Sequence, residues 1–335
     1  MKLTRKNSIT LSLVAILMLL ILSSCGKNEE SQTLNYEIKT ISGVKTFVND
    51  NKPSIDKIDM DIVEKYVING DTEDSLTSFQ IQQPIIDMDI NGNIYITDMK
   101  SASIKKFDSS GKFLAQLGKK GTGPGEFFMP SSTISLNDTV YGFDATLKIN
   151  KYDSSGKFTS AKNVSQAEGL PTMLKRAGNN FIGFRVSPEQ KDNKIFLNFD
   201  LVLMDNKFKN ILKVAKNRFE LDMTKPMNPM DFITFFTVGN NEIFVAEKST
   251  DHFKIKVYDF SGKSLYNITK KYRQTKYSQR ELDKINKILA DAVKNAPMMQ
   301  PEMKLDNKFK DAITGMWFDK NGRLWVGTAK EDDGK

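Results

Sequence analysis

The sequence has one cysteine and one histidine in 335 residues. A single cysteine excludes an internal disulfide and any zinc site built from several cysteines. A single histidine, His252, excludes metal sites that need several histidines from one chain. Arginine is also scarce, because 42 of the 49 basic residues are lysines. Nucleic-acid readers favour the planar fork of arginine, and the lysines are dispersed along the chain, so we expect no nucleic-acid partner.

Long apolar runs are missing too. The longest apolar run covers residues 9–22. It is too short for a transmembrane helix, which needs about 20 residues. It follows the basic residues Lys2, Arg5 and Lys6. A positive segment before a short apolar run is typical of a secretory signal peptide.

The only cysteine of the chain stands at the end of this signal. Residues 22–26 are LSSCG, which resembles a bacterial lipobox with Cys25 at the lipidated position. The resemblance implies that residues 1–24 are removed and that acyl chains on Cys25 anchor the protein stably in a membrane. We therefore expect a lipid-anchored protein of the bacterial cell envelope, held in the outer membrane and facing the periplasm or the cell surface. The alternative is an ordinary secretory signal with a chance cysteine.

The polar stretch after the signal, residues 25–41, predicts a flexible tether. Within it, Lys27, Glu29 and Glu30 resemble an acidic surface-export signal known in one Gram-negative phylum. The alternative is a charged segment that only keeps the tether solvated. The remaining residues, 42–335, predict a folded domain.

A repeat organises this domain. In its clearest unit, apolar and polar residues alternate in four short segments separated by turns of Asn, Asp, Ser and Gly, which predicts four antiparallel strands. The predicted strands cover residues 85–90, 94–98, 103–107 and 112–117. Related units cover residues 140–158, 180–208 and 242–263, and a fifth opens at 318–327. Four-stranded units that recur about every 40–50 residues are typical of a β-propeller.

One glycine-rich loop carries a family resemblance. Residues 118–127 (GKKGTGPGEF), followed by Pro130, resemble the inter-blade loop of NHL-repeat propellers. Over residues 42–335 the chain is similar to bacterial six-bladed β-propeller lipoproteins of the NHL and TolB-like group. The resemblance implies an all-β, six-bladed propeller of four-stranded antiparallel blades, in which a strand at 62–68 pairs into the last blade and closes the ring. Because the sequence ends after two strands of the fifth unit, we expect that the C-terminal blade is truncated.

Two insertions interrupt the repeat, at residues 217–230 and at about 272–310. The second predicts a helix over 277–296, because Ser278 and Glu281 form a capping box and apolar residues then recur at helical spacing. This apolar stripe consists of Leu282, Ile285, Ile288, Leu289 and Val293. We expect the stripe to be buried against blade loops, so that the helix covers one face of the ring as a ligand lid or as a structural brace.

The inter-blade loops share one face of such a propeller with the loops between the second and third strands of each blade. Charged residues in these loops could hold a polar ligand or a peptide. The candidates for this binding face are Asp98, Lys100, Asp144, Lys148, Arg185, Glu247 and His252. The two aspartates could instead bond to the backbone of the next turn, and the histidine could be an ordinary surface residue. Trp317 and Trp325 lie in predicted strands, and we expect them in the core.

Motifs of catalysis are missing from the sequence. It contains no nucleophile elbow and no phosphate-binding loop, and one histidine is too few for the amidating-lyase propellers. We therefore expect no catalytic residue, no metal and no cofactor, and a membrane-anchored binding or scaffold module for a protein, peptide or glycan. The alternative is a metal-dependent hydrolase like the lactonases and gluconolactonases, because spacing alone does not reveal carboxylate and amide ligands of a central ion.

Overall fold

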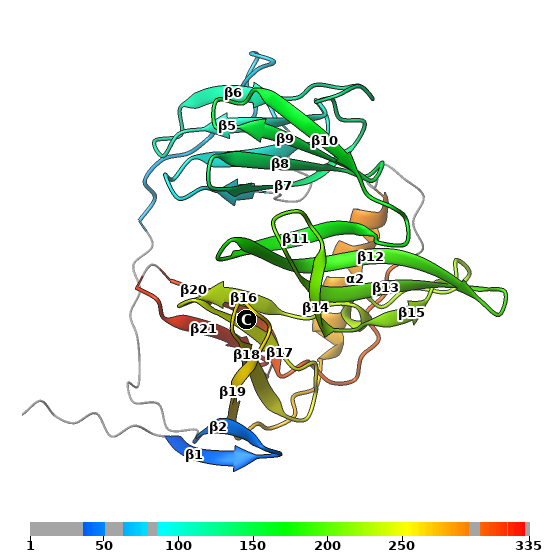
Figure 1. Cartoon of the computed structure of the whole chain (residues 1–335). Coiled ribbons are helices and arrows are strands. Elements are labelled where there is room, and N and C mark those ends of the chain that lie inside the picture. The colour runs from blue at the N-terminus through cyan, green and yellow to red at the C-terminus, as the bar shows by residue number, and fades with distance from the viewer. Residues whose placement is uncertain (1–35, 51–62, 80–85, 295–301, 320, 332–335) are drawn as a thin grey trace, which may run out of the picture.

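The computed structural model describes residues 36–50, 63–79, 86–294, 302–319 and 321–331. Its strands form five sheets. The first strand of each sheet between residues 86 and 328 contacts the first strand of the next, so the sheets follow one another around a common axis as the blades of a propeller (Figure 1). The all-β architecture with one helical insertion is confirmed.

Blades 1 and 2 have the predicted four antiparallel strands, each paired with the next along the chain. Blade 1 consists of β3 (Ile86–Met88), β4 (Ile94–Asp98), β5 (Ser103–Phe107) and β6 (Phe113–Leu117). Blade 2 consists of β7 (Pro130–Leu136), β8 (Thr139–Asp144), β9 (Lys148–Asp153) and β10 (Phe158–Asn163). The predicted bounds of β4 and β5 are confirmed to the residue, because turn residues stop the alternating pattern at each end.

Blade 3 is built on a longer hairpin. Its strands are β11 (Leu170–Ala177), β12 (Asn180–Lys191), β13 (Lys194–Met204), β14 (Asn210–Ala215) and the short β15 (Arg218–Glu220). The β12–β13 hairpin projects beyond the other blades (Figure 1). Beyond the core, β13 pairs with β15 over residues 196–198, which extends the sheet outward.

Blade 4 gains two strands from the N-terminal part of the chain. Its own strands are β16 (Phe236–Gly239), β17 (Glu242–Ala246), β18 (Phe253–Tyr258) and β19 (Ser264–Lys270), and the added hairpin is β1 (Tyr36–Ile41) and β2 (Val44–Asn49). Strand β2 runs parallel to β19, from Thr46 opposite Asn267 to Asn49 opposite Lys270. Residues 36–41, which the sequence assigns to the tether, are therefore a strand, because the outer edge of blade 4 offers unpaired backbone groups.

The ring-closing strand predicted at 62–68 is not formed over its described part. Residues 63–72 have no regular secondary structure and lie against blade 1, where Tyr66 and Ile68 lie beside Gly111. Further along, the Lys105 ammonium donates to the carbonyl of Ser75 at 3.0 Å. A strand needs a partner edge for its backbone groups, and these residues cover a hairpin turn instead.

The fifth sheet consists of β20 (Ile313–Phe318) and β21 (Leu324–Thr328). Met316 and Phe318 pack against blade 4. Because side chains alternate along a strand, Trp317 and Trp325 lie on the opposite face, where their rings stack 6.4 Å apart. The expectation that both belong to the core is wrong, since Trp317 is 51% exposed.

The hydrophobic core lies between successive blades. Between blades 2 and 3, Tyr141, Phe143 and Ile149 meet Phe181 and Phe208. Equivalent clusters join blades 1 and 2, blades 3 and 4, and blade 4 and the β20–β21 pair. Each sheet therefore depends on its neighbour for burial, as blades of a propeller do.

A single type of turn recurs in all five sheets. An aspartate carboxylate accepts hydrogen bonds of 2.8–3.0 Å from the N–H groups two and four residues later, in the turns that begin at Asp108, Asp153, Asp205, Asp259 and Asp319. The fourth residue of four of these turns is a glycine with φ between 73° and 91°. In blade 3 this residue is Phe208, with φ of 62°.

The glycine-rich loop at 118–127 is folded tightly between blades 1 and 2. The N–H of Gly121 donates to the Phe127 carbonyl at 2.9 Å, and the Tyr152 hydroxyl donates to the carbonyl of Gly125 at 2.9 Å. Gly118 has φ of 71°, and a Cβ there would lie 2.5 Å from the buried ring of Phe127. The loop composition is therefore explained by packing and by backbone conformation.

Candidate functional site

The two aspartates of the predicted binding face are engaged within their own loops. Asp98 accepts from the Lys100 N–H at 3.1 Å and from the hydroxyl of Ser101. Asp144 is fully buried, and its carboxylate accepts from the N–H groups of Phe128 and Met129 at 2.7 and 3.0 Å. These carboxylates organise turns, as the structural alternative expects.

The two lysines of the predicted face differ in their contacts. The Lys148 ammonium donates to the carbonyls of Thr122 and Gly123 at 3.3 and 3.1 Å, which ties the start of β9 to the glycine-rich loop. Lys100 is exposed.

Arg185 does not belong to the predicted loop. It lies within β12 and is 4% exposed. Its guanidinium donates to the Gly169 carbonyl at 2.7 Å, to the side chain of Asn210 at 3.0 Å and to the carbonyl of Phe208. The expectation of an exposed ligand-binding arginine is wrong, because β12 continues past this position and buries the side chain inside blade 3.

Of the predicted residues, Glu247 and His252 are brought together. The imidazole Nε2 lies 2.9 Å from Glu247 Oε1, and Nδ1 lies 2.7 Å from Asp251 Oδ1. The hydrogen bond to Glu247, followed by that to Asp251, raises the pKa of His252 above its ordinary value. Lys254 and Lys256 also pair with Glu247, at 3.1 and 2.7 Å. This loop is an exposed, mixed-charge surface of blade 4.

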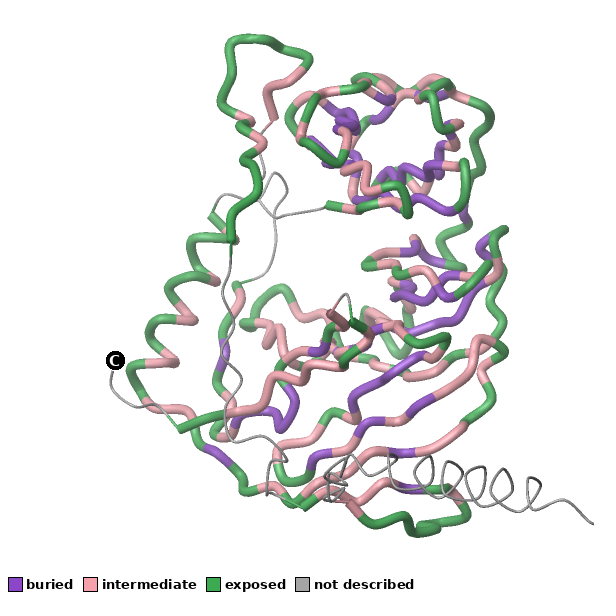
Figure 2. Tube along the Cα trace, turned by 90° about the vertical axis from the view of Figure 1, so that its left-hand side faces the viewer, coloured by how far each residue is buried: buried purple, intermediate pink, exposed green. Residues whose placement is uncertain are grey.

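The helical insertion begins at the predicted cap. Helix α2 (Gln279–Lys294) follows Ser278, whose N–H donates to the Glu281 carboxylate at 2.9 Å, while the Glu281 N–H donates back to the Ser278 hydroxyl at 3.2 Å. The expectation of a buried apolar stripe is wrong. No residue of α2 is buried, Ile288 is 60% exposed, and the helix runs along the edge of the molecule (Figure 2).

The two insertions hold each other. The Met227 N–H donates to the Glu302 carbonyl at 2.7 Å, and the Lys304 N–H donates to the Met227 carbonyl at 2.9 Å. On the other side of this segment, the Asn286 side chain of α2 bonds to both the N–H and the carbonyl of Leu305, at 2.7 and 3.1 Å. The helix therefore rests on the segment that follows it. These contacts favour the brace over the lid.

An ion pair near the propeller axis joins three blades. Arg176 on β11 donates to both carboxylate oxygens of Asp87 on β3, at 2.9 and 3.0 Å. The same guanidinium donates to the Ser135 carbonyl on β7 at 2.9 Å and to the carbonyl of Met88 at 2.7 Å. These groups satisfy one another and hold blades 1, 2 and 3 together. The sequence pattern did not reveal them.

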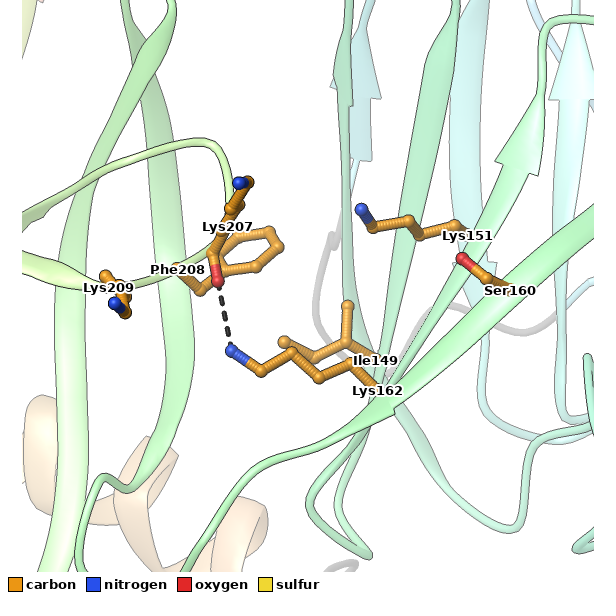
Figure 3. Close-up of a pocket in the computed structure, with 7 residues that line it drawn as sticks. All are labelled: Ile149, Lys151, Ser160, Lys162, Lys207, Phe208 and Lys209. Atoms are coloured by element: carbon orange, nitrogen blue, oxygen red, sulfur yellow. Dashed lines mark hydrogen bonds between the residues drawn. The ribbon is translucent and has the colours of Figure 1, made fainter.

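A cavity of about 420 Å³ lies between blades 2 and 3. Its floor is apolar and consists of Ile149 and Phe208, which are 0% and 2% exposed. Its rim carries four lysines, Lys151, Lys162, Lys207 and Lys209, together with Ser160. Lys151 and Lys162 project from blade 2 toward the turn at 207–209 (Figure 3). The signal that could have found this site is a phenylalanine where the repeated turn has glycine.

Comparison with known proteins identifies the family. A family model, DUF5128, described as a 6-bladed beta-propeller, matches residues 37–295. The chain belongs to this six-bladed propeller family. An exported protein of Bacteroides fragilis NCTC 9343 has 16% identity over 73% of this chain and 70% of its own, with a TM-score of 0.41. BamB from Moraxella catarrhalis has 14% identity over 56% and 53%, with a TM-score of 0.26. Both similarities are too low to indicate function, and no curated protein matches the chain significantly.

Within the DUF5128 propeller fold, the described residues supply four blades and the β20–β21 pair. In this described part of the chain, no three His, Cys, Asp or Glu side chains gather closely enough to hold a metal ion. No helix in the same residues has the length and apolar content to cross a membrane. Cys25 and the predicted signal lie outside the described residues.

Proposed function

We propose that this protein is a lipid-anchored propeller of the bacterial cell envelope that binds a ligand and does not catalyse a reaction. The proposal places it among the NHL and TolB-like lipoproteins, with Cys25 as the anchor in the outer membrane. The cavity between blades 2 and 3 is the observation that carries the binding role, because it is concave, mostly apolar on its floor and rimmed by polar groups. The exposed Glu247–His252 loop adds a surface for a protein, peptide or glycan.

The anchor is tested by metabolic labelling with radioactive palmitate. The natural chain is expected to take up label and to fractionate with membranes, whereas Cys25→Ala is expected to do neither. Equal labelling of both proteins would contradict the lipid anchor, because no other cysteine is present.

The binding role is tested by blocking the cavity. Native mass spectrometry of the Cys25→Ala chain, mixed with a small-molecule extract of the cell envelope, should show a bound mass. Ser160→Trp places a large ring in the cavity and should abolish this adduct. Ala161→Trp is the matched control, because the adjacent side chain of β10 points to the other face of the blade. Absence of any adduct in the parent chain would contradict a ligand-binding function.

The metal-dependent lactonase alternative has no observation in its favour among the described residues. Such an enzyme needs carboxylate and amide oxygens that converge on a central ion, and the described part contains no such acidic group of three. Two charged residues on the inner strands β3 and β11, Asp87 and Arg176, bond to each other instead.

A further inference from the structure

The lysines around the inter-blade cavity have no acidic partners. None of Lys151, Lys162, Lys207 and Lys209 forms an ion pair within the described residues, and the cavity lining contains no carboxylate. The one carboxylate of the adjacent turn, Asp205, accepts from the backbone N–H groups of Lys207 and Lys209 at 2.8 Å each. The cavity therefore has an uncompensated positive rim.

Two of these ammonium groups have defined contacts, one across the cavity to blade 3 and one within blade 2. Lys162 on β10 donates to the Lys207 carbonyl at 3.0 Å, so its charge is held between the two blades (Figure 3). The Lys151 ammonium lies 5.2 Å from the ring centroid of Tyr141, a favourable position for a cation. Both contacts use neutral partners, which leaves the charges available to an anion.

The floor between these charges is a phenylalanine in an unusual conformation. The turn in which Phe208 stands has glycine at the same place in blades 1, 2 and 4 and in the β20–β21 pair. A bulky residue with φ of 62° is strained, and such strain is concentrated at functional sites. Here it places an aromatic ring under the lysines, 2% exposed, beside Ile149.

We propose that this cavity binds an amphipathic organic anion. Its apolar body lies along the methylene stems of the lysines, above the buried side chains of Phe208 and Ile149, and its carboxylate, sulfate or phosphate group lies among the ammonium groups. This inference rests on the proposed binding function and adds the chemical class of the ligand. A soluble anion and an anionic lipid headgroup share this chemistry.

The test compares two fluorescent probes that differ in charge. The sulfonate 8-anilinonaphthalene-1-sulfonate and the neutral N-phenyl-1-naphthylamine have the same aromatic body. Signal from the cavity is defined as the part that Ser160→Trp removes and Ala161→Trp does not. In the Cys25→Ala protein, the cavity affinity derived from this signal should be at least about tenfold higher for the sulfonate than for the neutral probe. Added salt should reduce this difference in affinity.

Charge variants then separate a local effect from the overall positive charge. The triple variant Lys151→Gln, Lys162→Gln and Lys209→Gln should lose about tenfold in affinity for the sulfonate and change that for the neutral probe by less than about twofold. The matched control removes three exposed lysines from equivalent turns: Lys112→Gln, Lys157→Gln and Lys263→Gln. It should leave both affinities unchanged.

Competition distinguishes the two sources of the anion. Displacement of the sulfonate probe by decyl sulfate but not by decyl maltoside supports a soluble anion. Displacement by phosphatidylglycerol vesicles but not by phosphatidylcholine vesicles supports a lipid headgroup. Displacement by the neutral member of both pairs overturns the proposal.

The remaining outcomes separate this proposal from the binding function. If the cavity binds both probes with equal affinity and replacing its lysines by glutamine changes neither affinity, the anion proposal is overturned and the binding function stands. If the control triple variant loses as much affinity for the sulfonate probe as the variant with three cavity lysines replaced, the attraction comes from the overall charge and the proposal is overturned. If neither probe gives a signal that Ser160→Trp removes and no envelope adduct is seen, both proposals are overturned.

Discussion

Truncating Phe208 removes an aromatic ring from the centre of the contact between blades 2 and 3. The ring stacks on Phe181 with centroids 5.1 Å apart, and its neighbours Tyr141 and Phe143 lie at 5.2 and 5.4 Å. Replacing a buried phenylalanine by alanine lowers the free energy of unfolding by about 3–5 kcal/mol, because contacts are lost and a cavity remains. We expect Phe208→Ala to fall in this range.

The backbone of Phe208 contributes a second effect of opposite sign. Its φ of 62° lies in the left-handed region, which costs an L-residue about 1–2 kcal/mol and costs glycine almost nothing. Phe208→Gly loses the same ring but relieves this strain. We therefore expect the free energy of unfolding of Phe208→Gly to exceed that of Phe208→Ala by about 1 kcal/mol. At a position in an ordinary strand the order is reversed, because glycine there lowers the free energy of unfolding by about 0.5–1 kcal/mol relative to alanine.

Urea unfolding followed by tryptophan fluorescence measures these differences. The matched control is Phe143, which is fully buried in the same cluster and lies in β8 without a positive φ. There, Phe143→Gly should be less stable than Phe143→Ala. If Phe208→Gly also falls below Phe208→Ala, and by a similar amount, the strain argument is refuted.

Three further perturbations test the contacts that hold the ring, the helix and the blade 4 loop. Arg176→Met leaves the partly buried Asp87 carboxylate without its counter-charge and should lower the free energy of unfolding by about 1–3 kcal/mol. Arg218→Met, in an exposed pair, should change it by less than about 1 kcal/mol, and similar losses in both variants would contradict the role of the axial pair. Ser278→Ala removes the cap of α2 and should speed hydrogen exchange in the helix by roughly the equivalent of 1 kcal/mol without changing exchange in the blades; unchanged exchange in α2 would contradict the capping box. Because His252 has a raised pKa in the folded state, its protonation favours folding below its unfolded pKa, and this contribution is lost as the pH rises through the folded pKa. Glu247→Gln should lower the pKa of this residue, measured from the one imidazole signal of the chain, and an unchanged pKa would contradict the pairing.

The local pattern of the sequence predicts the strands of blade 1 well. In β4 and β5 the alternation is interrupted at both ends by turn residues, so the bounds follow from nearest neighbours. In blade 3, the hairpin of β12 and β13 extends to Lys191 and Lys194 because the two strands pair with each other, and β13 also pairs with β15. The local pattern does not show that β12 continues past Arg185, and for this reason the sequence places this residue in a loop.

Distant partners also explain which site residues the pattern could not predict. Asp87 and Arg176 are 89 residues apart and meet because both stand on inner strands near the axis. The apolar stripe of α2 predicts an amphipathic helix correctly, but it does not specify what the helix packs against. Its main partner is the segment around Leu305, which belongs to the same insertion and has no repeat pattern.

The departure from the repeat at Phe208 is the sequence feature that points most directly to a ligand. The aspartate of each turn makes the same backbone hydrogen bonds in all five sheets, so the turn itself does not require a phenylalanine. Filling the core between two blades accounts for the ring but not for four lysines without acidic partners around it. An anion with an apolar body accounts for these lysines, because its apolar part lies along their methylene stems above the ring and its charge neutralises their ammonium groups.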